Sequence, residues 1–385
     1  MTSKIAHVIT GLDVGGAETA LFKLLSRCDR TRFDPVVISL TSVGPIGDRI
    51  RALGIPVFAL HIRSAFSAVP GVIRLAALLR ANRVGLIQTW MYHADLLGGV
   101  VGAIAGRIPV VWGIRQSSFD PRSCKRSTVW IARLCGRLSR WIPTAILACS
   151  VEARRLHVDI GYDPSIEVIP NGFDLEQLKP DPGAKDCLRA ELGIPVGSVV
   201  VGLVARFDPQ KGHDTFLRAA GLIALRFPDV HFVLCGTEVV RSNARLLAWI
   251  TDAGIREKCH LLGPRGDIEK ITPGFDIAVS ASTGEGFSNT VGEAMACGVP
   301  CAVTDVGDSA ETVGETGQVA PARDPEALAK AIGALIEAGA EGRKRLGVAA
   351  RRRIAERYEL GVVVGRYEDV YERILSKERL NRCAV

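Results

Sequence analysis

Short apolar runs alternate with longer amphipathic segments along both halves of the chain. In the first half, apolar runs of strand length occupy residues 4–10, 35–40, 56–60, 86–90, 110–114 and 145–150. Segments whose apolar residues recur every three to four positions separate these runs, as in 18–28 and 70–82. Strands that alternate with helices in this way predict βαβ units and a mainly parallel sheet.

A second series of the same kind begins after a polar stretch rich in Pro and Gly. Its strand-length runs occupy residues 199–207, 231–236, 260–263, 277–282 and 301–305. We therefore predict an α/β protein with two doubly wound, Rossmann-like domains over 1–171 and 198–360, joined by an interdomain linker over 172–197. Open sheets of this type bind ligands at the carboxyl ends of their strands, so chemistry is expected in loops that follow strands and in a cleft between facing domains.

Composition and charge narrow the possible partners. The 385 residues are 48% hydrophobic and 23% charged, which is typical of a globular protein with room for two cores. The net charge of +7 is modest. No dense basic stripe or nucleic-acid-binding motif accompanies it, so no nucleic acid is expected as a partner.

Cysteine usage and the apolar stretches predict the location of the protein. Ten cysteines are scattered singly, several of them within apolar runs, as is typical of reduced cytosolic thiols. The N-terminus lacks the apolar stretch of a signal peptide, and the uncharged stretch 96–106 is shorter than the about 20 residues that span a bilayer. A cytoplasmic location is expected, with at most a peripheral contact on the inner face of a membrane.

The loop after the first strand contains adjacent glycines, Gly15 and Gly16, directly before a helical segment. Glycine lets the backbone approach a ligand closely, and a helix N-terminus favours anions. The spacing matches neither the dinucleotide-binding nor the Walker motif. Two interpretations stay open, a loop that contacts a ligand and a plain βα turn.

Two cations follow the first strand of the second series. Arg206 and Lys211 are five residues apart in a loop that leads into a helix. An arginine fork and a lysine point charge at such a position can bind a diphosphate and neutralise charge on a leaving group. The alternative is a pair of solvated basic residues on a surface loop.

Two glutamates lie eight residues apart after the run at 277–282. Thr290 and Glu293 fit the capping-box pattern at a helix start, and Gly298 is placed to end that helix. Glu285 lies between two glycines before the helix, where a carboxylate stabilises no helix and is suited to accept hydrogen bonds from ligand hydroxyls. Glu285 is therefore predicted to be functional, whereas Glu293 is structural, functional or both.

These motifs resemble family 4 of the retaining, nucleotide-sugar-dependent glycosyltransferases, which have the two-domain GT-B fold. The resemblance extends over nearly the whole chain. It rests on VARFDPQKG, EGFSNTVGEAMACGVP and GDSAETVGETG, together with GGAE, YHADLLGGVVGAIAGRIPVVW and EVIPNGFD. The final segment, 361–385, resembles the family's closing helix, which crosses back over the first domain.

The resemblance implies roles in donor binding. Gly15 and Gly16 would lie beside the donor diphosphate, and Arg206 and Lys211 would bind this diphosphate and stabilise it as it leaves. Glu285 would contact sugar hydroxyls of the donor. Glu293 would bind the ribose hydroxyls.

Further donor contacts are implied at the start of the helix. Backbone amides would hold the sugar, and polar groups of the first helical turn would lie by the phosphates. The residues concerned are Gly286, Phe287, Ser288, Asn289 and Thr290.

Two residues of the first half are candidates for the acceptor side. His93 follows the run 86–90, near the place where members of the family often have a histidine, and Arg115 follows the run 110–114. For His93, a catalytic or acceptor-positioning role and a packed histidine with satisfied nitrogens stay open. Arg115 is expected to contact acceptor or phosphate, with the same alternative.

The implied activity is hexosyl transfer with retention of the anomeric configuration. The donor would be a nucleotide-sugar, a UDP-sugar more than a GDP-sugar, and the acceptor a glycan or lipid-linked saccharide, as in cell-surface polysaccharide biosynthesis. The departing diphosphate would take up the acceptor proton. No cofactor is expected, and without a D-x-D motif no metal either. The alternatives are a nucleotide-sugar epimerase of similar fold and a non-catalytic nucleotide-sugar-binding protein.

Residues 122–141 contain basic residues and no acid. The basic residues are Arg122, Lys125, Arg126, Arg133, Arg137 and Arg140. Helical spacing places Trp130, Ile131, Leu134, Leu138 and Trp141 on one side and most of the arginines on the other. Either this helix contacts an anionic membrane and serves a lipid-linked acceptor, or it is an ordinary helix with a solvated basic face.

Overall fold

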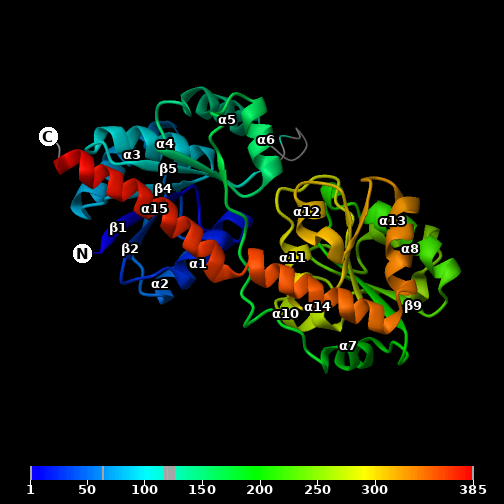
Figure 1. Ribbon diagram of the computed structural model, residues 1–385. Helices are drawn as coiled ribbons and strands as arrows, with labels where there is room; N and C mark the ends of the chain where they lie inside the picture. The colour runs from blue at the N-terminus through cyan, green and yellow to red at the C-terminus, as the bar shows by residue number, and fades with distance from the viewer. Residues whose placement is uncertain (1, 63–64, 117–118, 120–125, 384–385) are drawn as a thin grey trace. The chain divides into compact units, whose positions relative to one another are not determined.

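The computed structural model describes residues 2–62, 65–116, 119 and 126–383 and has two compact domains (Figure 1). The first domain comprises Met1–Gly172 and Leu360–Val385, and the second comprises Phe173–Glu359. Each has a parallel sheet with helices on both faces, so the prediction of two doubly wound α/β domains is confirmed.

The first domain contains a seven-stranded sheet of order β3-β2-β1-β4-β5-β6-β7. Its strands are β1 (Ser3–Ile9), β2 (Phe33–Ser39), β3 (Val57–Ala59), β4 (Leu86–Trp90), β5 (Val110–Ile114), β6 (Ala145–Ala148) and β7 (Glu167–Val168). All of their pairings are parallel. The six predicted strands are confirmed, and β7 at the edge is an addition.

Helices cover both faces of this sheet and bury its apolar side chains. They are α1 (Gly16–Arg27), α2 (Pro45–Ala52), α3 (Ala65–Ala81), α4 (Tyr92–Ile104), α5 (Arg126–Leu138), α6 (Val151–Asp159) and α15 (Leu360–Cys383). One apolar core includes residues of α3 to α6, and the other includes residues of α1, α2 and α15.

The second domain contains a six-stranded parallel sheet of order β10-β9-β8-β11-β12-β13. Its strands are β8 (Val199–Val204), β9 (Val230–Cys235), β10 (Cys259–Leu261), β11 (Ile277–Ser280), β12 (Cys301–Thr304) and β13 (Gln318–Ala320). The five predicted strands are confirmed, and β13 is an addition at the edge.

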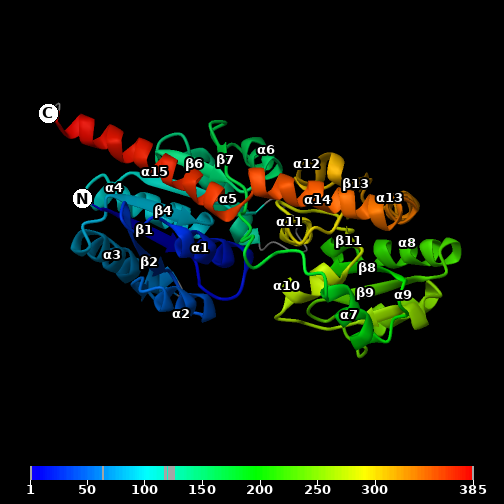
Figure 2. The ribbon, with the colours of Figure 1, turned by 60° about the horizontal axis from the view of Figure 1, so that its bottom comes forward.

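Helices also cover both faces of the second sheet (Figure 2). They are α7 (Ala184–Leu192), α8 (His213–Arg226), α9 (Ala244–Asp252), α10 (Ile268–Ile271), α11 (Asn289–Ala296), α12 (Ser309–Val313), α13 (Pro325–Glu337) and α14 (Gly339–Arg357). One core includes residues of α8, α9 and α13, and the other includes residues of α7, α11 and α14.

The segment expected to be an interdomain linker, 172–197, belongs to the second domain from Phe173 onward. Its helix α7 is bound there by a buried ion pair, in which Arg189 Nη2 lies 2.6 Å from Asp276 Oδ2 and the two side chains are 9% and 7% exposed. Lys185 Nζ contacts the other oxygen of the same carboxylate at 2.6 Å. The polar composition of the segment reflects a helix with one buried face, because Leu188 is buried in the domain core.

The last helix, α15, packs on the first domain. Val363, Tyr367, Tyr371 and Ile374 of this helix are buried in the core that also contains residues of α1. Tyr371 Oη donates a hydrogen bond to Gln88 Oε1 of β4 at 3.3 Å. The first domain is therefore assembled from the two ends of the described chain.

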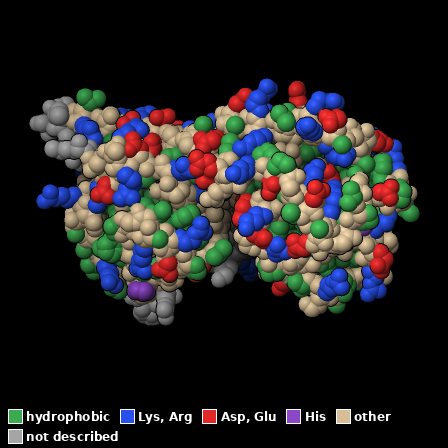
Figure 3. Space-filling view, turned by 90° about the horizontal axis from the view of Figure 1, so that it is seen from below, with side chains coloured by type: hydrophobic (Ala, Val, Ile, Leu, Met, Phe, Trp, Pro, Cys, Tyr) green, Lys and Arg blue, Asp and Glu red, His purple; other side chains and the backbone are tan. Residues whose placement is uncertain are grey.

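Acidic and basic side chains are interspersed on the face of the molecule shown in Figure 3. In the described part of the chain, no helix combines the length and the apolar character that a membrane crossing requires.

Candidate functional site

The loop after β8 is held against the end of β11. Its last three residues form a short 3-10 helix, η1 (Pro209–Lys211), which Asp208 caps by accepting a hydrogen bond from the Gln210 N–H at 2.8 Å. Gly212 follows with a φ of +62°, and a Cβ atom there would overlap the carbonyl oxygen of Ala281. Glycine at this position therefore provides both the left-handed turn and the close approach that fix Lys211.

Two of the predicted residues meet at this place. Lys211 Nζ lies 2.5 Å from Glu285 Oε1, and the side chains are 22% and 12% exposed. The same carboxylate oxygen accepts a hydrogen bond from Ser282 Oγ at 2.7 Å. Lys211 and Glu285, 74 positions apart in sequence, thus form a partly buried ion pair at the carboxyl ends of β8 and β11.

The loop that carries Glu285 is fixed by the segment after β12. Gly307 has a φ of +56°, and a Cβ atom there would overlap the carbonyl oxygens of Glu285 and Gly286. The Asp308 N–H donates a hydrogen bond to Gly286 O at 3.1 Å. The backbone of residues 285–286 is therefore set by its neighbours, as a binding loop requires.

The start of α11 differs from the predicted capping box. The helix begins at Asn289 with Ser288 as its N-cap, and the Ser288 side chain makes no capping hydrogen bond. Thr290 is therefore already inside the first turn rather than at the N-cap. The predicted end is confirmed, because Gly298 has a φ of +75° just past the helix. The capping box is therefore not centred on Thr290, and the structural role of Glu293 and its contact with ribose both stay predictions.

Lys211, Ser282, Glu285 and Thr290 line one small pocket together with the ends of β8 and β11. The pocket thus combines a cation, a carboxylate, two hydroxyls and the start of a helix. Such a set can bind a ligand that has both a diphosphate and hydroxyl groups.

Arg206, the second predicted cation, lies outside this lining. Its side chain is 61% exposed, and its Nε atom lies 3.2 Å from Asp208 Oδ2. Burial alone would raise the pKa of Asp208, but the hydrogen bonds from Gln210 and Arg206 outweigh it and lower the pKa. The structure leaves Arg206 paired on the surface, and its contact with diphosphate stays a prediction.

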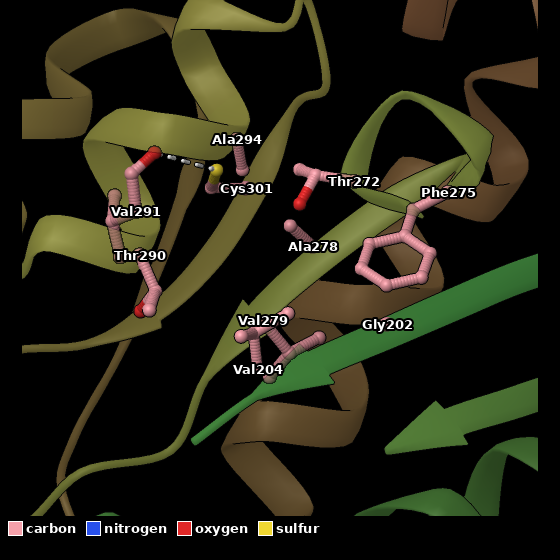
Figure 4. A pocket seen from close by; sticks show the side chains of 10 residues that line it. All are labelled: Gly202, Val204, Thr272, Phe275, Ala278, Val279, Thr290, Val291, Ala294 and Cys301. Atoms are coloured by element: carbon pink, nitrogen blue, oxygen red, sulfur yellow. Dashed lines mark hydrogen bonds between the residues drawn. The ribbon is translucent and has the colours of Figure 1, made fainter. Parts of the chain in front are cut away.

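An apolar pocket lies beneath α11, and Thr290 is among the residues that line it (Figure 4). Val291 and Ala294 of α11 line it, opposite Phe275 and Ala278. Phe287 is also buried in the core of this region, rather than being turned to a ligand. Val204, Val279 and Thr290 line both this pocket and the polar one, so the polar pocket borders an apolar region.

In the first domain, Gly15 and Gly16 lie at the start of α1. Gly15 is the N-cap of the helix, and its carbonyl oxygen accepts a hydrogen bond from the Thr19 N–H at 3.0 Å. A Cβ atom at Gly16 would meet no protein atom within 4 Å. The described fold does not itself require glycine at 16, so the open space there is suited to a ligand.

His93 lies in the first turn of α4, directly after β4. Burial lowers the pKa of this half-buried histidine, which favours the neutral imidazole. Met91, the N-cap of the helix, has a φ of +74° and a ψ of 157°, a conformation that costs free energy in any residue except glycine. Backbone strain of this kind is common at functional sites.

Asp95 was missed in the sequence and fixes the turn that carries His93. Its Oδ1 atom accepts hydrogen bonds from Thr89 Oγ1 at 2.6 Å and from the Gly113 N–H at 3.3 Å. Burial raises the pKa of the Asp95 carboxyl to about 7. An acidic residue within an otherwise apolar helix start was the sequence signal that could have identified it.

The exposed face of α5, together with the turn that follows it, carries tryptophan and arginine. Trp130, Arg126, Arg133 and Arg137 of the helix are exposed, and so are Arg140 and Trp141 directly after it, with the two tryptophans 66% and 77% exposed. The buried residues of this helix are Ala132, Cys135 and Gly136. The predicted separation of tryptophans from arginines is therefore wrong, because the small residues of the helix face the core. Arg122 and Lys125 lie outside the described residues.

Comparison with known proteins identifies relatives for both domains. Residues 14–177 match the model of the Glycosyltransferase Family 4, and residues 198–338 match that of the Glycosyl transferases group 1. The UDP-Gal:alpha-D-GlcNAc-diphosphoundecaprenol alpha-1,3-galactosyltransferase of Escherichia coli is 28% identical over 318 residues, 79% of each chain. The putative glycosyltransferase EpsF of Bacillus subtilis is 27% identical over 314 residues, 78% of this chain and 79% of EpsF.

Solved structures share the fold. The crystal structure of Alr3699/HepE of Anabaena in complex with UDP superposes with a TM-score of 0.84, at 23% identity over 96% of this chain and all of that one. A sucrose-phosphate synthase from Thermosynechococcus elongatus superposes with a TM-score of 0.77 at 18% identity, over 97% of this chain and all of the synthase. The predicted GT-B fold is confirmed.

Proposed function

Because the chain belongs to the group 1, family 4 glycosyltransferases, we propose that it transfers a hexosyl residue from a UDP-sugar to a lipid-linked saccharide with retention of configuration. The observation that carries this proposal is the pocket in which Lys211, Glu285, Ser282 and Thr290 meet at the ends of two strands. The names of the relatives support the choice of donor and acceptor. One is a UDP-galactose-dependent enzyme with a diphospholipid-linked acceptor, and HepE was crystallised with UDP and with UDP-glucose.

In the proposed donor complex, the pair of Lys211 and Glu285 opens. The ammonium of Lys211 binds the diphosphate, and the carboxylate of Glu285, held by Ser282, accepts hydrogen bonds from sugar hydroxyls. The amides at the start of α11 add a positive dipole for the phosphates. Arg206, Asn289 and the glycine loop at Gly15 and Gly16 contribute further diphosphate contacts, and Glu293 binds the ribose.

In the proposed reaction, the acceptor hydroxyl attacks the anomeric carbon on the face from which the diphosphate leaves. The bond between that carbon and the phosphate oxygen breaks, the new glycosidic bond forms, and the departing diphosphate takes the acceptor proton. Lys211 stabilises the charge that grows on the leaving group, so the charge stabilisation needs no metal ion. His93, neutral and fixed at the start of α4, positions the acceptor hydroxyl.

Incubation with nucleotide-sugars and a short-chain GlcNAc-diphospho-prenol tests the proposal. We expect UDP release from one UDP-sugar to accelerate when the acceptor is present, a product whose linkage by NMR keeps the donor configuration, and no effect of EDTA. An inverted linkage would overturn retention of configuration. Loss of turnover in EDTA would overturn the proposal that no metal ion is needed. An isomerised nucleotide-sugar, or binding without turnover in every mixture, would overturn the transferase itself.

We also propose that the exposed face of α5 binds the anionic inner leaflet that holds such an acceptor, which places the protein on the cytoplasmic side. Exposed tryptophans insert at the headgroup level, and arginines beside an anionic surface contribute about 1 kcal/mol each. We expect the protein to sediment with phosphatidylglycerol vesicles in low salt, and the double variant Arg133→Glu, Arg137→Glu to bind at least about 30-fold more weakly.

The matched control for the membrane experiment has the same change of net charge in the second domain. Arg241 and Arg256 are exposed there, and the double variant Arg241→Glu, Arg256→Glu should bind vesicles nearly as well as the unchanged protein. Equal losses in both double variants would assign binding to overall charge. Absence of binding in low salt would remove the membrane contact.

A further inference from the structure

Arg115 directly follows β5 and carries unpaired hydrogen-bond donors. Its Nε and Nη1 atoms are buried, and none of the described residues accepts a hydrogen bond from them. Burying guanidinium N–H groups without acceptors costs free energy, because water is lost and nothing replaces it. The buried guanidinium therefore keeps donors available for a group that the described residues do not supply.

The guanidinium is nevertheless held in place. Its Cζ atom lies 4.8 Å from the centre of the Trp90 ring, a cation–π contact. The indole is fixed in turn, because Trp90 Nε1 donates a hydrogen bond to His7 Nδ1 at 3.3 Å and the ring stacks on Tyr367 with 6.2 Å between the centroids. Arg115 is therefore positioned by two buried aromatic residues, one of them from α15.

No carboxylate in the described part of the chain forms an ion pair with this cation. Among the described residues, the ion pairs of the first domain use other arginines, such as Arg32 with Glu368 and Arg155 with Glu152, and none includes Arg115. A positive charge with free N–H donors on Nε and Nη1 matches the oxygens of a phosphate group.

The position in the sheet indicates which ligand brings the phosphate. Arg115 lies at the carboxyl end of β5, next to β4, whose end carries His93, and on the same edge as the glycine loop after β1. Under the proposed function, on which this inference rests, His93 positions the acceptor. We infer that Arg115 binds phosphate oxygens of a diphosphate-linked acceptor in the first domain.

The test compares acceptor analogues that differ only in the diphosphate. Calorimetry would measure binding of geranylgeranyl diphosphate and of geranylgeraniol to the full chain. Neither measurement requires turnover. We expect Arg115→Gln to weaken binding of the diphosphate by about 10–100-fold and to leave binding of the alcohol unchanged. Arg74→Gln, which removes an exposed arginine of α3 in the same domain, should change neither.

Titration with UDP distinguishes the two sources of diphosphate. The affinity for UDP should be the same in Arg115→Gln and the unchanged protein, and a parallel loss for UDP would assign Arg115 to the donor and overturn the inference. Arg115→Lys keeps the positive charge without the guanidinium and should recover part of the diphosphate affinity. This variant also provides the test if Arg115→Gln does not fold. Equal affinity for the diphosphate in all variants would overturn the inference, whereas absence of transferase activity would overturn the proposed function alone.

Discussion

We expect the Lys211→Met variant to lose about 10²–10³-fold in kcat, which corresponds to about 3–4 kcal/mol of transition-state stabilisation. Methionine keeps an unbranched apolar stem as far as Cε but lacks the charged ammonium. The ammonium lies 2.5 Å from Glu285 Oε1, and the lysine side chain is 22% exposed, so it is partly shielded from water. A cation in such a place stabilises charge on a leaving diphosphate more strongly than one in bulk solvent.

Steady-state kinetics with a UDP-sugar would measure this loss. Lys330→Met is the matched control, because Lys330 is exposed on α13 and lies outside the pocket. We expect its kcat to be unchanged. If Lys211→Met keeps the kcat of the unchanged protein while remaining folded by circular dichroism, Lys211 does not stabilise the leaving group.

The Asp276→Ala variant should lose about 3–5 kcal/mol in the free energy of unfolding of the second domain. Asp276 accepts hydrogen bonds from Arg189 at 2.6 Å and from the Val200 N–H at 2.9 Å. Its removal leaves the Arg189 guanidinium buried without its counter-charge. Lys185 contributes less, because its side chain is 47% exposed.

Calorimetry would resolve this change, since two domains need not unfold in one step. Asp252→Ala removes an exposed carboxylate of α9 in the same domain and should change stability by no more than about 0.5 kcal/mol. If both variants lost equally little free energy of unfolding, the buried ion pair would contribute little to stability.

The Asp276 carboxylate also makes the stability of the second domain depend on pH, with a loss of stability at low pH. Burial would raise the pKa of Asp276, but the hydrogen bonds from Lys185 and Val200 and the charge of Arg189 outweigh it and lower the pKa. At pH values between the two pKa values, the unfolded chain therefore binds more protons at Asp276 than the folded chain does. The contribution of Asp276 to the free energy of unfolding is complete above the unfolded pKa of about 4. It is lost as the pH falls further, and the loss should be smaller in Asp276→Ala.

Most strands were predictable because a strand buried on both faces of a parallel sheet is a continuous apolar run. The two strands that were missed, β7 and β13, have two and three residues and lie at sheet edges, where the pattern is partly exposed. Helix α7 was taken for a linker because its buried polar side chain, Arg189, is paired with a residue 87 positions away. No local pattern reveals such a partner.

The candidate site was predictable in its residues and not in its contacts. Lys211 and Glu285 could be selected because each follows a strand in a glycine-containing loop. Their direct contact depends on the order of strands in the sheet, which places β8 beside β11. The roles of Ser282 and Asp95 and the unpaired donors of Arg115 depend on burial in three dimensions. The helix start was misplaced because Ser288 and Thr290 are both suitable N-cap residues.

The return of α15 to the first domain has a consequence for biosynthesis. The ribosome must translate all of Phe173–Glu359 before the buried tyrosines of α15 emerge, about 190 residues that take roughly 10–40 s at 5–20 residues per second. During that interval the nascent first domain exposes the apolar surface that Tyr367 and Tyr371 later cover. The second domain can complete its core first, so the N-terminal half of the polypeptide is the later of the two to mature and the one that calls for chaperone protection.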